Sequence, residues 1–134
     1  MTPFSLLLQL SGLTQREAAT FLDSREDTVR SWSLGRRNAP PGVIEQMRDL
    51  IDRQEEAAVQ AIRQIEAMSD DMTPDEIEIG YPADDHEAQE LGFPTVSAWG
   101  AMAARVIADI GADIRLVPRG STATSAKAAD AHNR

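Results

Sequence analysis

The sequence contains no cysteine, which excludes disulfides, zinc–thiolate and iron–sulfur centres, and thiol nucleophiles. It also lacks the glycine-rich loop that binds phosphates and the Gly-x-Ser-x-Gly elbow of serine hydrolases. The apolar run at residues 4–10 is interrupted by Ser5 and Gln9 and follows no positive charge, so it predicts neither a signal peptide nor a membrane span. We therefore expect a cytoplasmic protein without thiol chemistry.

Histidine is scarce as well, with one residue near the middle of the chain and one close to its end. His86 stands beside Asp84, Asp85 and Glu87, whereas His132 belongs to the C-terminal tail. A lone histidine among carboxylates is more typical of a surface loop than of a metal centre or a general base. The acidic residues between positions 70 and 78 lack the spacing of a calcium-binding loop. We predict no metal, no cofactor and no enzymatic activity.

The composition is that of a soluble globular protein, because 42% of the 134 residues are hydrophobic and 26% are charged. The net charge of −9 argues against a nucleic-acid partner, since phosphate binding needs positive charge. The charge is uneven, however: residues 1–53 contain seven arginines and seven acidic residues, whereas the remaining 81 contain six basic and fifteen acidic ones. A neutral, arginine-bearing N-terminal part is compatible with a polyanionic partner, and the acidic remainder suits another role.

Three short helices are predicted in about the first 35 residues. The first covers residues 4–10, begins at Thr2 and Pro3 and ends at Gly12. Its inward side chains are expected to be three leucines, Leu6, Leu7 and Leu10.

The second and third helices are predicted from their caps. Thr14 followed three residues later by Glu17 is a capping box, which predicts a short second helix. Ser24 with Asp27 is a weaker cap and predicts a third helix that ends near Gly35.

After a turn at residues 38–42, apolar residues recur at helical spacing to position 68, as one long helix or two in series. Residues 76–81 alternate as in a strand, 84–91 suit a polar helical turn, 95–110 a helix and 113–118 a second strand. The predicted fold is mainly α with a small C-terminal α+β part. It has an N-terminal helical unit with a long connecting helix at 1–68, a C-terminal unit at 69–118 and a disordered tail at 119–134.

Residues 13–32 have the spacing of a helix-turn-helix. Ala18 and Ala19 leave room for a second helix to cross closely, and the turn falls at Asp23, where glycine is usual. The angle between the helices is filled by three larger apolar side chains, Leu22, Val29 and Trp32. Such an arrangement presents the outer face of the second helix to a DNA major groove, where arginine pairs with guanine.

The stretch Thr14–Pro40 resembles the helix-turn-helix of Cro and the phage repressors. More narrowly, the element Trp32-x-x-Gly35-Arg36 with a proline at position 40 is similar to the anti-CRISPR-associated repressors. The similarity continues in the order of elements, a long helix, an isoleucine-rich strand, a tryptophan-bearing helix and a final strand. The resemblance implies an N-terminal unit that binds an inverted repeat of double-stranded DNA and a C-terminal unit that forms a homodimer.

Three groups of residues are the candidates for these contacts. The predicted base contacts are Arg25, Glu26, Asp27, Arg30 and Ser31. The predicted phosphate contacts are Gln15, Arg16, Arg36 and Arg37. The predicted dimerisation residues are Ile77, Ile79, Trp99, Ile114 and Leu116. Trp32 and Trp99 lie on apolar helical faces and are interpreted as core anchors rather than base-stacking residues.

Two alternatives stay open. Glu26 and Asp27 can hold Arg25 and Arg30 in local salt bridges, which would withdraw both arginines from the bases. At the level of function, the leading hypothesis is a dimeric repressor of its own operon. The alternative is an antitoxin whose acidic C-terminal part neutralises a toxin protein while the N-terminal part binds the operator.

Overall fold

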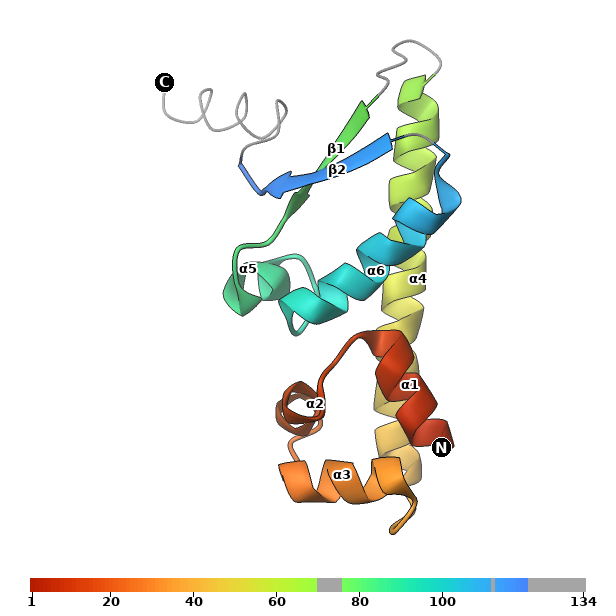
Figure 1. The fold of residues 1–134 in the computed structure, drawn as a ribbon, viewed down its shortest axis with the longest axis vertical. Helices are drawn as coiled ribbons and strands as arrows, with labels where there is room; N and C mark the ends of the chain where they lie inside the picture. The colour runs from red at the N-terminus through yellow and green to blue at the C-terminus, as the bar shows by residue number, and fades with distance from the viewer. Residues whose placement is uncertain (70–75, 112, 121–134) are drawn as a thin grey trace.

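The computed structural model describes residues 1–69, 76–111 and 113–120. Within them, a mainly helical N-terminal part is joined to a small two-stranded parallel sheet with a helix, so the predicted fold class is confirmed (Figure 1). Of the predicted disordered tail at 119–134, residues 119 and 120 are described, and the backbone N–H of Arg119 donates to the carbonyl of Tyr81 at 2.9 Å. The rest of the predicted tail, and residues 70–75 of the predicted break before the first strand, lie outside the described residues. The elements are α1 (Pro3–Ser11), α2 (Gln15–Phe21), α3 (Glu26–Leu34), α4 (Pro41–Ser69), β1 (Glu76–Tyr81), α5 (Asp85–Glu90), α6 (Val96–Asp109) and β2 (Asp113–Pro118).

Helix α1 begins and ends where the sequence indicates, but it turns a different face inward. Thr2 and Ser5 form a capping box, and Gly12 ends the helix in the left-handed conformation. The prediction that Leu6 and Leu10 point inward is wrong, because these side chains are 47% and 50% exposed. The buried stripe consists of residues spaced four and three apart, Phe4, Leu8 and Ser11.

The caps of α2 and α3 differ in kind. The predicted capping box of α2 is confirmed, since Glu17 N–H donates to Thr14 Oγ1 at 3.1 Å and Thr14 N–H donates to Glu17 Oε1 at 2.9 Å. The predicted cap of α3 is wrong: Arg25 is the N-cap residue, and no side chain caps this helix. Ser24 still belongs to the preceding turn, where its hydroxyl donates to the carbonyl of Leu22 at 3.1 Å.

Helix α4 is one continuous helix of 29 residues, which resolves the question of one helix or two. It runs along the long axis of the molecule, and α1 and α6 both pack against it (Figure 1). Its buried stripe is Val43, Met47, Leu50, Ile51, Gln54 and Ala58. In the part of the chain that the structure describes, no helix has both the length and the apolarity to cross a membrane.

The hydrophobic core is shared by the N-terminal helices and the C-terminal part. One cluster of buried side chains contains residues of the first four helices, from Phe4 to Leu50 in the sequence. It also contains Phe93, Trp99 and Ala103. Trp32 and Trp99 are each 6% exposed, so their interpretation as core anchors is confirmed. Helix α6 is therefore part of the packing that supports the first four helices.

The two strands pair in parallel, and the chain connects them through α5 and α6, as a parallel pair requires. In the register of this pair, Ile77 lies opposite Ile114 and Ile79 lies opposite Leu116. Because side chains alternate along a strand, these four apolar residues share one face of the sheet.

Candidate nucleic-acid interface

The turn between α2 and α3 has the geometry that a helix-turn-helix needs. Asp23 adopts a φ of 50°, in the left-handed region that glycine usually occupies in such turns. Ala18 and Ala19 are 0% and 7% exposed, which fits their predicted place at the close crossing of the two helices. Helices α2 and α3 pack directly on each other as a result.

Helix α3 is fixed from its inner side. Val29 and Trp32 are buried, and the hydroxyl of Thr2 donates to the carbonyl of Trp32 at 3.1 Å. Gly35 ends the helix with a φ of 79°. These contacts leave the outer side of α3 to solvent, where Arg25, Glu26, Asp27 and Arg30 are exposed and Ser31 is half-buried.

A shallow hollow of about 250 Å³ lies over α3. It brings the predicted base contacts Arg25, Asp27 and Ser31 together with Arg37, a predicted phosphate contact. The hollow also includes Thr28, which the sequence reasoning missed. Thr28 could have been predicted from its position three residues before Ser31, because residues three apart lie on the same face of a helix.

The arginines of this region carry no carboxylate partner. Within the described parts of the chain, no ion pair within 4.0 Å involves Arg16, Arg25, Arg30, Arg36 or Arg37. The proposed local salt bridges from Glu26 and Asp27 to Arg25 and Arg30 are therefore not formed. Residues 24–40 hold four arginines and two carboxylates, a local net charge of +2.

The segment after α3 keeps Arg36 and Arg37 beside that helix. The backbone N–H groups of both residues donate to the carbonyl of Ser31, at 3.0 Å for Arg36 and 3.4 Å for Arg37. Both side chains are exposed. The other two predicted phosphate contacts lie in the first turn of α2, where Arg16 is exposed and Gln15 is half-buried.

The predicted dimerisation residues divide into two groups. Ile77, Ile79 and Ile114 are half-buried and Leu116 is 44% exposed, all on one face of the sheet. Trp99 requires a correction, since its side chain is buried in the core of its own chain and is not available to a partner. Its apolar helical face already has neighbours on α1 and α4.

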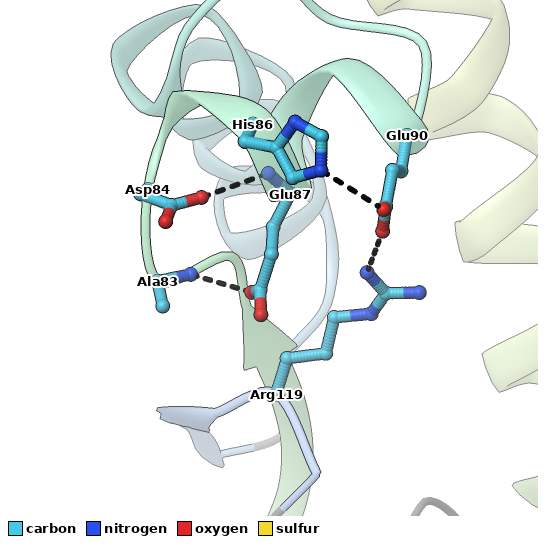
Figure 2. A network of polar contacts seen from close by, with 6 residues as sticks. All are labelled: Ala83, Asp84, His86, Glu87, Glu90 and Arg119. Carbon is cyan, nitrogen blue, oxygen red and sulfur yellow. Dashed lines mark hydrogen bonds and ion pairs between the residues drawn. The ribbon is translucent and has the colours of Figure 1, made fainter.

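The acidic residues around His86 have structural tasks of their own (Figure 2). Asp84 caps α5 by accepting from Glu87 N–H at 2.9 Å, and Glu87 accepts from Ala83 N–H at 2.7 Å. His86 lies 3.5 Å from Glu90, whose other oxygen lies 3.6 Å from the guanidinium of Arg119. Among the described residues, no group of three or more histidines and carboxylates has the arrangement of a metal site.

No protein-family model matches this chain, and a search of curated proteins finds no match to it.

Proposed function

We propose that the protein is a homodimeric, sequence-specific DNA-binding repressor that acts on its own operon. The observation that carries the proposal is the set of unpaired arginines around the exposed side of α3. An arginine without a carboxylate partner offers all of its N–H donors to phosphate oxygens or to guanine O6 and N7. Four of these arginines lie between residues 24 and 40: Arg25 directly before α3, Arg30 on it, and Arg36 and Arg37 after it.

The negative net charge of the chain is compatible with DNA binding because most of the excess acidic residues lie outside the N-terminal part. Residues 1–53 are neutral overall, and the fifteen acidic residues that follow exceed the six basic ones. Within the helix-turn-helix, Glu17 is occupied in the capping box of α2. Glu26 and Asp27 stand in the first turn of α3, where they interact favourably with the helix dipole, and Glu26 can accept from cytosine N4.

The sheet supports the homodimeric part of the proposal. An isolated two-stranded sheet is marginally stable in water, and both strands here have an unpaired edge within the described residues. Pairing with a second copy around a twofold axis would extend the sheet and cover Leu116. The same axis would set the two α3 helices about 34 Å, one DNA turn, or a multiple of it apart, so the operator is an inverted repeat. Repression is then steric, by occupation of the promoter.

The experiment that tests the proposal is selection of binding sites from random duplex DNA by the full chain at physiological salt. We expect an inverted repeat to be enriched, and the Arg30→Ala variant to enrich it less. Failure to enrich any sequence would overturn the proposal. Co-purification of a second small protein from the native host in equal amount would instead favour the antitoxin, although the ordered strands and helices of residues 76–118 are unlike an extended neutralising segment.

A further inference from the structure

A hydrogen bond joins the first turn of α6 to the first turn of α2. The hydroxyl of Ser97 donates to Glu17 Oε1 at 2.9 Å, and the two residues are 80 positions apart. The same oxygen accepts from the N–H of Thr14. Neither helix needs the Ser97 bond for its own capping, because Thr14 caps α2 and Thr95 caps α6. The Ser97 hydroxyl also lies 2.8 Å from the hydroxyl of Thr95, so the bond to Glu17 joins the capping box of α2 to the N-cap of α6.

A buried glutamine makes a second connection at the same place. Gln54 of α4 is 0% exposed, and its side-chain nitrogen donates to the carbonyls of Ser11 at 2.8 Å and Ala98 at 2.9 Å. These carbonyls belong to the end of α1 and to the first part of α6. Because a buried amide must satisfy its donors, Gln54 selects one arrangement of three helices over other apolar packings.

Close backbone contact makes the third connection. Gly12 has a φ of 78°, and a Cβ at this position would lie 2.6 Å from the carbonyl oxygen of Ser97 and 3.0 Å from Ala101 Cβ. The corner between α1 and α2 therefore rests against α6 at a distance that only glycine permits. We call these contacts, made by Gly12, Glu17, Gln54 and Ser97, the α6 junction.

We propose that the α6 junction is a positioning device and that Ser97 is its positioning residue. Through Glu17 it holds α2, and with it the α2–α3 unit, at one angle to the C-terminal part. The inference rests on the proposed function in one respect: in a dimer paired through the sheet, this angle determines how far apart the two α3 helices lie. Ser97 then restricts the half-site spacing that the dimer accepts, although it touches no DNA.

The test compares the parent with Ser97→Ala, a change that suits a helix. It keeps the bonds from Glu17 N–H to Thr14 and from Ala98 N–H to Thr95, and it removes the Ser97 contacts with Glu17 and with the Thr95 hydroxyl. Affinity is measured for the selected operator, for repeats lengthened or shortened by one base pair, and for a single half-site. We expect unchanged half-site affinity and a loss of about tenfold or more in the preference for the selected spacing, the effect of one hydrogen bond to a carboxylate. Equal weakening of all sites, or an unchanged preference, would overturn the inference.

Two matched variants act as controls. Ser97→Thr keeps the donor hydroxyl, and Glu17→Gln keeps a side-chain oxygen that can accept from it. We expect Ser97→Thr to keep the spacing preference of the parent, and Glu17→Gln, whose acceptor is neutral, to keep part of it. If Ser97→Thr behaves like Ser97→Ala, the hydroxyl is not responsible and the inference is wrong.

A measurement without DNA separates this inference from the proposed function. Because the chain has no cysteine, spin labels can be attached at Thr20→Cys on α2 and Ala104→Cys on α6, both exposed positions. In samples diluted with unlabelled protein, we expect Ser97→Ala to broaden the distance distribution between the labels. Broadening in a protein that binds no DNA would support the junction and refute the repressor, and an unchanged distribution would refute the junction alone.

Discussion

The rings of Phe4 and Trp32 meet edge to face, with 5.5 Å between their centroids and 72° between their planes. This contact joins α1 to the inner side of α3, next to the bond from Thr2 to the carbonyl of Trp32. It also explains which face of α1 points into the core. With the Phe4 ring held against Trp32, the inward stripe passes through Leu8 and leaves Leu6 in solvent.

We expect Phe4→Ala to lower the free energy of unfolding by about 3 to 5 kcal/mol, since the ring is 2% exposed and its removal leaves a cavity beside Trp32. Leu6→Ala on the same helix should change it by about 0.5 kcal/mol or less. Urea unfolding followed by tryptophan fluorescence measures both. Equal losses of unfolding free energy in the two variants would show that α1 turns another face towards the core.

Two glycines give a paired prediction about the backbone. Gly12→Ala should destabilise the fold by at least about 1 to 2 kcal/mol, because the left-handed conformation is unfavourable for alanine and the new Cβ meets the Ser97 carbonyl. Gly100→Ala, within α6, has open space around the new Cβ and should stabilise by about 0.5 to 1 kcal/mol. Thermal unfolding of both variants is the measurement. A stable Gly12→Ala protein would contradict the close contact with α6.

The features that the sequence predicted well are local. The capping box of Thr14 and Glu17 needs two residues three apart, and the turn at Asp23 needs a residue that tolerates a positive φ. Burial of Trp32 and Trp99 followed from their place on apolar helical faces. Each of these inferences uses a short window of sequence, in which the determining interactions lie.

The features that were missed depend on contacts between distant parts of the chain. The inward face of α1 is set by Trp32 rather than by the number of leucines. The assignment of Trp99 to a dimer contact was wrong because its side chain is enclosed in the core of its own chain. Gln54 lies at helical spacing between Leu50 and Ala58, but its burial was not predicted because the inward stripe of α4 was identified from apolar residues alone. In the candidate interface, helical spacing placed the arginines on α3, but only the side-chain positions show that Glu26 and Asp27 do not pair with them.

Gln54→Leu should destabilise the protein by about 2 to 4 kcal/mol, because the carbonyls of Ser11 and Ala98 each lose a buried donor. Gln60→Leu is the matched control, since Gln60 is exposed on the same helix. Its cost should be about 0.5 kcal/mol or less. Chemical unfolding checks both, and a neutral Gln54→Leu would show that the buried amide does not hold the junction.

The proposed dimer interface can be tested by introducing a charge into it. Leu116→Glu places a carboxylate on the apolar face of the sheet, and we expect it to convert a dimer at micromolar concentration into a monomer. Leu91→Glu, at the end of α5 and 38% exposed, should remain dimeric. Light scattering gives the molar masses. A monomeric parent protein would refute pairing through the sheet.

Arg30 and Arg36 should affect DNA binding in different ways. Arg30 is exposed in the middle of α3, where we propose a base contact. We therefore expect Arg30→Ala to weaken operator binding by about 1 to 3 kcal/mol and to relax the preference at one base pair of each half-site. Arg36 follows the helix, where its backbone is held by Ser31. A phosphate contact carries no sequence information, so Arg36→Ala should weaken all sites about equally.

The salt dependence distinguishes the two roles. Binding of the protein releases about one condensed counterion from the DNA for each phosphate contact that it makes. The loss of one such contact in Arg36→Ala should therefore make the slope of log affinity against log salt shallower by about one unit. Arg30→Ala should leave this slope nearly unchanged, because its effect comes from the loss of hydrogen bonds between the arginine and a base. Fluorescence titrations of matched and mismatched operators over a salt series give slopes and preferences together. Unchanged affinity in both variants would show that α3 does not contact DNA. If instead Arg36→Ala relaxed the base preference and Arg30→Ala changed the salt slope, Arg36 would be the base contact and Arg30 the phosphate contact.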